Sequence, residues 1–101
     1  MIVEFAVVPI GTGEELADLV AGVIELVDSS GLDYQLTAMG TIVEGEWDEV
    51  FGLIKACHLH MRRKAGRVET RVTVDDRDKA AGRIKGKVAD VEARLGRSLK
   101  T

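Results

Sequence analysis

The chain has 101 residues, 46% hydrophobic and 31% charged, with a formal net charge of −3. These values are ordinary for a soluble globular protein of one domain, so we expect residues 1–101 to form a single domain. The acidic balance excludes a general attraction to phosphate backbones or anionic membrane surfaces. The single cysteine, Cys57, excludes an internal disulfide. With no signal-peptide pattern and no long apolar run, the sequence predicts a cytoplasmic protein.

Alternating apolar residues predict a first strand over Ile2–Pro9, which ends where Pro9 cannot donate to a ladder. Thr12 and Glu15 then have the spacing of a helix capping box. Apolar residues recur at helical spacing from Leu16 to Val27, and Ser29-Ser30-Gly31 ends this helix. Tyr34 to Glu44 reads as two extended segments, with a tight hairpin at Met39-Gly40-Thr41.

A second amphipathic helix is predicted from Trp47 to Met61, ending in the cations Arg62-Arg63-Lys64. Residues 67–75 alternate as a fourth strand. A third helix follows from about Asp78, with an apolar stripe made of Ile84, Val88, Val91 and Leu95. The order is strand, helix, strand, strand, helix, strand, and then the extra helix.

Two right-handed β-α-β crossovers place both main helices on one face of a four-stranded antiparallel sheet, so the fold class is α+β, a ferredoxin-like sandwich with an added C-terminal helix. We expect the helices to cover Val3, Phe5, Val7, Val68, Val72 and Val74. The opposite, open face would display Glu4, Ala6, Val8, Thr37, Met39, Glu69, Arg71 and Thr73. That face is too apolar along the first strand to stay bare, so a second subunit or the stripe of the third helix should cover it.

The chain resembles the small thiamine-binding proteins with a ferredoxin-like fold, formerly an uncharacterised family. The resemblance runs nearly end to end, and its most specific block is Met39-Gly40-Thr41-Ile42-Val43-Glu44-Gly45. Weaker blocks in the same order are Val8 to Gly13, Gly31-Leu32 before Tyr34-Gln35-Leu36, Lys55 to His58, Arg67-Val68 and Asp75-Asp76-Arg77. The resemblance implies a protein that is not an enzyme and assembles by packing sheet faces, commonly as a homotetramer built from dimers. It also implies binding of thiamine or its hydroxymethylpyrimidine part near subunit interfaces, as a carrier, buffer or sensor.

Thiamine combines an aminopyrimidine with a cationic thiazolium, so its site needs a carboxylate, hydroxyl or backbone groups, and a soft apolar surface. The candidates that could supply these are Glu4, Glu44, Thr37, Thr41 and Met39. The alternative for Glu4 and Glu44 is an ion pair with Arg71, across the sheet or across a dimer. Trp47 could stack on the pyrimidine or simply pack against the sheet edge.

The sequence gives little support for metal binding, RNA binding or catalysis. Cys57, His58 and His60 resemble metal ligands, but His58 and His60 point to different sides of a helix. The open face lacks the aromatics that RNA-binding sheets use, and no residue pair has the spacing of a catalytic site. We therefore expect no metal, cofactor, nucleic-acid or membrane partner. The rival function is a ligand-free interaction module that only builds a homo-oligomer.

Overall fold

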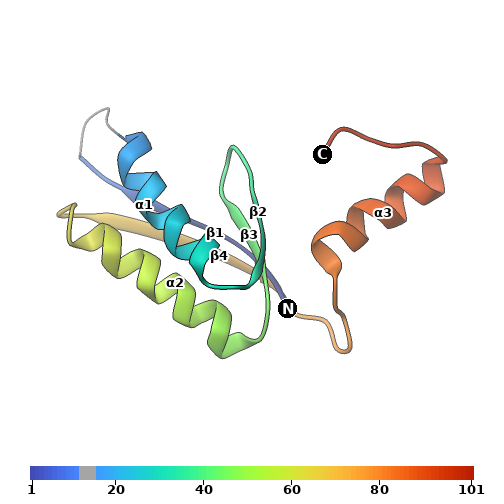
Figure 1. The fold of residues 1–101 in the computed structure, drawn as a ribbon, viewed down its shortest axis with the longest axis horizontal. Coiled ribbons are helices and arrows are strands. Elements are labelled where there is room, and N and C mark those ends of the chain that lie inside the picture. Colours follow the sequence, from blue (N-terminus) through green and yellow to red (C-terminus); the bar gives the residue numbers. More distant parts are fainter. Residues whose placement is uncertain (12–15) are drawn as a thin grey trace.

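Four antiparallel strands form one sheet in the order β2-β3-β1-β4 in the computed structural model, which describes residues 1–11 and 16–101 (Figure 1). The strands are β1 (Ile2–Pro9), β2 (Asp33–Leu36), β3 (Thr41–Glu44) and β4 (Val68–Asp75). The helices are α1 (Leu16–Ser29), α2 (Trp47–Arg62) and α3 (Arg83–Leu95). This element order and strand order confirm the predicted ferredoxin-like fold with an added helix. The predicted Thr12–Glu15 capping box lies outside the described residues.

The register separates the two faces of the sheet. Val3 lies opposite Val43 and Val74, and Phe5 lies opposite Thr41 and Val72. These residues face α1 and α2, because directly opposed side chains in an antiparallel pair point to the same side. The buried core on that side consists of Val3, Phe5, Val7, Val23, Val27, Val43, Val50, Leu53, Ile54, Cys57 and Met61.

Two predicted core residues, Val72 and Val74, are less covered than expected. They face the helices but remain 36% and 37% exposed. The reason is the strand order, which makes β4 an edge strand. The prediction of full helix cover was therefore wrong at these two positions.

The hairpin and the third helix also differ from expectation. The turn spans Thr37–Gly40, one or two residues earlier than predicted, so Thr37 and Met39 do not belong to a strand. The Thr37 hydroxyl donates to the Gly40 carbonyl at 2.9 Å and accepts from the N–H groups of Met39 and Gly40 at 3.2 and 3.1 Å. These local bonds compete with the strand ladder and end it.

α3 begins at Arg83, five residues later than the predicted start at Asp78, and stands apart from the rest of the molecule (Figure 1). Gly82 has φ 64° in the left-handed region, which interrupts helical backbone at that point. α3 has no buried residue, and Val91 and Leu95 of its stripe are 49% and 53% exposed. The Cα radius of gyration is 15.1 Å, against about 12.7 Å for a compact chain of this length. No helix within the described residues is long and apolar enough to cross a membrane.

Candidate functional site

A notch opens beside the hairpin tip because β1 is longer than β3. The pairing of β1 with β3 stops at Phe5 opposite Thr41, whereas β1 continues to Pro9. Beyond Phe5, the β3-facing side of β1 has no neighbouring strand among the described residues. The resulting hollow has a volume of about 230 Å³. It is lined by β1, α1 and the hairpin: Phe5, Ala6, Val7, Val8, Val20, Val23, Ile24 and residues 36–41.

Three predicted site residues, two threonines and one methionine, line this notch. Thr41 is 4% exposed and faces the helix side, and its hydroxyl makes no hydrogen bond to another described residue. Met39 is 83% exposed and extends its thioether at the rim. The Thr37 hydroxyl is engaged inside the turn, so Thr37 positions the tip. The notch therefore joins one unpartnered hydroxyl to apolar walls and an unpaired strand edge.

Gly40 allows the hairpin tip to approach β1 closely. A Cβ built at this position would lie 3.0 Å from the Phe5 carbonyl oxygen. It would also lie 3.7 Å from the Glu4 Cγ, so the Glu4 side chain flanks the tip on the open face. Any larger residue at position 40 would push the hairpin away from β1 and change the shape of the notch.

Glu44 lies at the other end of β3 from the notch and holds the start of α3. Its carboxylate accepts from the Arg83 N–H at 2.9 and 3.1 Å and from the Ile84 N–H at 3.3 Å. Three residues of strand, about 10 Å, separate Glu44 from Thr41. The predicted ligand-binding residues Thr41 and Glu44 therefore lie at opposite ends of β3.

Arg71, the predicted ion-pair partner of Glu4 or Glu44, pairs with Glu69 instead. Arg71 Nε lies 3.6 Å from the Glu69 Oε1, and both side chains are more than half exposed. Such a pair contributes little to stability. Glu4 lies opposite Ile42 and Thr73 and is exposed on the open face. Within the described residues of one chain, neither Glu4 nor Glu44 forms an ion pair with Arg71.

Trp47 lies at the start of α2, away from the notch. Its ring stacks on Phe51 with centroids 4.4 Å apart and an interplanar angle of 28°. The residue is still 56% exposed. This geometry agrees with packing against the neighbouring helix turn rather than with stacking on a ligand in the notch.

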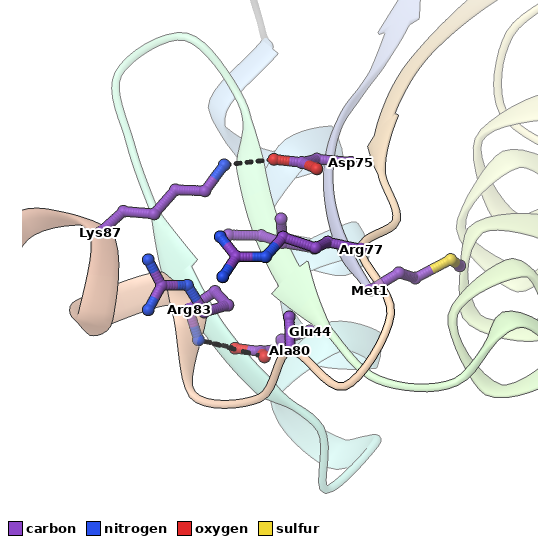
Figure 2. Close-up of a pocket in the computed structure, with 8 residues that line it drawn as sticks. Met1, Glu44, Asp75, Arg77, Ala80, Arg83 and Lys87 are labelled. Atoms are coloured by element: carbon purple, nitrogen blue, oxygen red, sulfur yellow. Dashed lines mark hydrogen bonds and ion pairs between the residues drawn. The ribbon is translucent and has the colours of Figure 1, made fainter.

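A second, smaller pocket of about 80 Å³ lies beside Glu44 (Figure 2). Its walls come from the sheet, from the connection between β4 and α3, and from α3 itself. Lys87 donates to the carboxylate of Asp75. This hydrogen bond, together with the charge of Lys87, lowers the pKa of Asp75 below its ordinary value. Arg77 and Arg83 also line this pocket.

The sequence reasoning missed both the apolar side of the notch and this cationic pocket. The helical spacing assigns Val20 and Ile24 only to the apolar stripe of the first helix. The sequence also carries Arg83, Lys85 and Lys87 on the third helix. No local signal connected them to Glu44, because Glu44 and Arg83 are separated by 39 residues.

Cys57 and its neighbouring histidines do not form a ligand cluster. Cys57 is fully buried and its thiol lies 3.9 Å from the Val23 carbonyl oxygen. His58 Nδ1 lies 2.6 Å from the Thr70 hydroxyl. Across residues 1–11 and 16–101, no three His, Cys, Asp or Glu side chains are grouped closely enough to hold a metal ion.

Burial makes the Cys57 thiol unreactive. It raises the pKa of the thiol to about 11, so at pH 8 only about one thiol in a thousand is ionised. We expect Ellman's reagent to label Cys57 at least about a hundredfold more slowly in the native protein than in guanidinium. Rapid stoichiometric labelling of the native protein would show that the thiol is accessible.

Comparison with known proteins connects this geometry to one family. The family model described as "Thiamine-binding protein" matches residues 3–92. A UPF0045 protein of Mycobacterium bovis is 36% identical over 96 residues, covering 94% of each chain. A UPF0045 protein of Synechocystis is 43% identical over 58 residues, covering 57% of this chain and 48% of the relative.

Solved structures agree with these matches. A hypothetical protein of Methanocaldococcus jannaschii superposes with a TM-score of 0.82 at 27% identity, covering 89% of this chain and 93% of that one. A candidate thiamine biosynthesis or salvage protein of Thermotoga maritima gives a TM-score of 0.79 at 26% identity, covering 89% and 96%.

Proposed function

The chain belongs to the thiamine-binding protein family, and from this premise we propose that it binds thiamine or its hydroxymethylpyrimidine part without chemical conversion. Its role would be to carry, buffer or sense the vitamin in the cytoplasm. The notch beside the hairpin tip is the proposed site. The observation that carries this assignment is the position of Thr41, which is 4% exposed and lines the notch beside the unpaired edge of β1.

The notch offers what an aminopyrimidine requires. The Thr41 hydroxyl can both donate and accept, so it can bond the amino group or a ring nitrogen of the pyrimidine. The unpaired edge of β1 beyond Phe5 presents backbone donors and acceptors, which suit the amino group and ring nitrogens of the pyrimidine. Phe5, Val7 and Ile24 supply apolar walls, and Met39 supplies a polarizable thioether at the rim. Glu4, beside the tip, is the nearest predicted carboxylate for the thiazolium cation.

The composition of the notch favours binding over catalysis. None of the described residues that line it has an ionisable side chain. General acid-base or nucleophilic chemistry on a bound pyrimidine would need such a group within hydrogen-bond reach. The walls of the notch therefore offer no reactive group, and the one carboxylate at its rim, Glu4, is assigned to the thiazolium cation.

Assembly through the open sheet face forms part of the proposal. Ile2, Ala6, Val8 and Ile42 form a partly buried apolar strip along the middle of that face. Ala6 and Val8 also line the notch, so a second copy packed on the open face would cover the notch mouth. We propose a homo-oligomer, a dimer or a tetramer built from dimers, with the ligand at the interface.

A Thr41→Val substitution tests the site with little change in shape. Thiamine and hydroxymethylpyrimidine should bind at least about tenfold more weakly, because one buried hydrogen bond is lost. The melting temperature without ligand should change little, because the valine side chain fills nearly the same space as threonine. Isothermal titration calorimetry and thermal melts measure both quantities.

Thr101→Val is the matched control, since Thr101 is exposed, lies outside the notch and does not belong to the sheet. It should bind as the wild type does. For the wild type, ligand at 100 times its dissociation constant should add about 2.7 kcal/mol of stability. Absence of both heat and thermal shift in the wild type would support the ligand-free interaction module. Unchanged binding in Thr41→Val would move the site elsewhere.

A further inference from the structure

The pocket beside Glu44 gathers positive charge from two parts of the chain (Figure 2). Arg77 enters from the connection after β4, and Arg83 and Lys87 enter from α3. Two carboxylates, Glu44 and Asp75, lie at its edges. Three cations around about 80 Å³ repel one another unless each finds an anionic partner.

Each carboxylate near the pocket already has a partner. Both oxygens of Glu44 accept from backbone N–H groups at the start of α3. Asp75 accepts from Lys87, and the Arg83 Nη2 donates to Asp90 at 3.0 Å. Asp75 and Asp90 therefore pair with other cations, the Glu44 oxygens are occupied by backbone N–H groups, and no described carboxylate forms an ion pair with Arg77.

One buried donor and one exposed cation remain at the pocket. Arg83 Nε is buried and has no hydrogen-bond partner among the described residues. Arg77 forms no ion pair with another described residue, although its charge is close enough to lower the pKa of Asp75 further. A buried guanidinium N–H without an acceptor is rare in folded proteins and costs free energy, so an acceptor from solution, water or an anion, should complete this position.

We infer that this pocket binds a phosphate-type oxyanion, either free phosphate or the phosphate group of a small monoester. Guanidinium groups favour phosphate because their donors match its oxygens in pairs. The volume of about 80 Å³ has room for a few water-sized groups, which suits one phosphate. The pocket shares no lining residue with the notch, so this inference stands independently of the proposed function.

The bound anion would join α3 to the sheet. Arg83 and Lys87 belong to α3, whereas Asp75 and Glu44 belong to β4 and β3. α3 buries none of its own residues, so it contributes few contacts that fix its position. An acceptor shared by Arg77 and Arg83 adds bonds at this junction, and phosphate should slow amide hydrogen exchange in α3.

The test compares inorganic phosphate, glycerol phosphate and chloride at equal ionic strength and pH. Thermal melts and ³¹P NMR line widths of the full chain report binding. Phosphate or glycerol phosphate should raise the melting temperature above that in chloride. A response to inorganic phosphate alone assigns free phosphate as the ligand. A response to both assigns the phosphate group in either form.

Arg77→Ala should weaken the apparent phosphate affinity about tenfold or more, since it removes charge-assisted hydrogen bonds. Its melting temperature in chloride should change little, because Arg77 is exposed. Lys85→Ala is the matched control, as Lys85 is an exposed cation of α3 that does not line this pocket. Arg77→Gln gives a second test of the same position should the alanine variant fold poorly.

Equal melting in phosphate and chloride would overturn the inference. Full phosphate response in both Arg77 variants would do so as well. An equal loss of response in Lys85→Ala would indicate a general effect of surface charge and would also overturn it.

Discussion

Ala6→Arg should release the proposed assembly into single subunits, measured as a fall in mass by sedimentation. Ala6 lies on the open face of β1, directly opposite Arg71. A second cation there would face Arg71 across the strand pair and would be buried beneath the covering subunit without a partner. Burial of an uncompensated charge costs about 3 kcal/mol or more, which weakens association at least roughly a hundredfold.

Ala56→Arg is the control for this substitution. Ala56 is exposed on α2, which packs on the other face of the sheet. The same change in charge at this position should leave the mass of the assembly unaltered. An Ala6→Arg protein with the mass of the wild-type assembly would show that the subunits associate through a different surface.

Glu44→Ala should loosen α3 and lower the stability of the protein by about 1–2 kcal/mol, because the carboxylate acts as a remote cap for the first N–H groups of that helix. For a domain of this size, the melting temperature should fall by roughly 5 to 10 °C. The amides of Arg83 and Ile84 should exchange faster with solvent, which hydrogen-exchange mass spectrometry or NMR would detect.

The same variant separates a structural role of Glu44 from a ligand role. Glu44 does not line the notch, so thiamine affinity should change by less than about threefold. Glu4→Ala is the control for stability, since its exposed carboxylate caps no helix. A large loss of thiamine affinity with unchanged exchange in α3 would instead make Glu44 a direct ligand contact.

The local spacing of apolar residues was sufficient to predict most of the helices and strands. The alternation in Ile2–Pro9 and the apolar spacing from Trp47 onward match the bounds of β1 and the start of α2. Errors arose where side chains bond backbone groups or where contacts are distant. Thr37 closes its own turn and shortens β2. The start of α3 depends on Glu44, 39 residues earlier, a contact that no short window of sequence contains.

The candidate site was only partly predictable, for a geometric reason. Period-two alternation places Thr41 and Glu44 on opposite faces of the sheet, which the register confirms. The alternation does not predict that β1 is longer than β3, and this difference in length creates the notch. Likewise, the unpartnered Nε of Arg83 and the gathering of Arg77 beside it appear only when distant segments of the chain are brought together.

The four-residue turn has an implication for how relatives with the same fold could come to prefer different molecules. Ala38 and Met39 supply wall to the notch but pair with no strand. Substitution or insertion of residues at this turn would change the surface that contacts the ligand. The pairing of β1 with β3, which begins at Phe5 and Thr41, would not change. Selectivity can therefore diverge at this tip almost independently of the folding free energy of the scaffold.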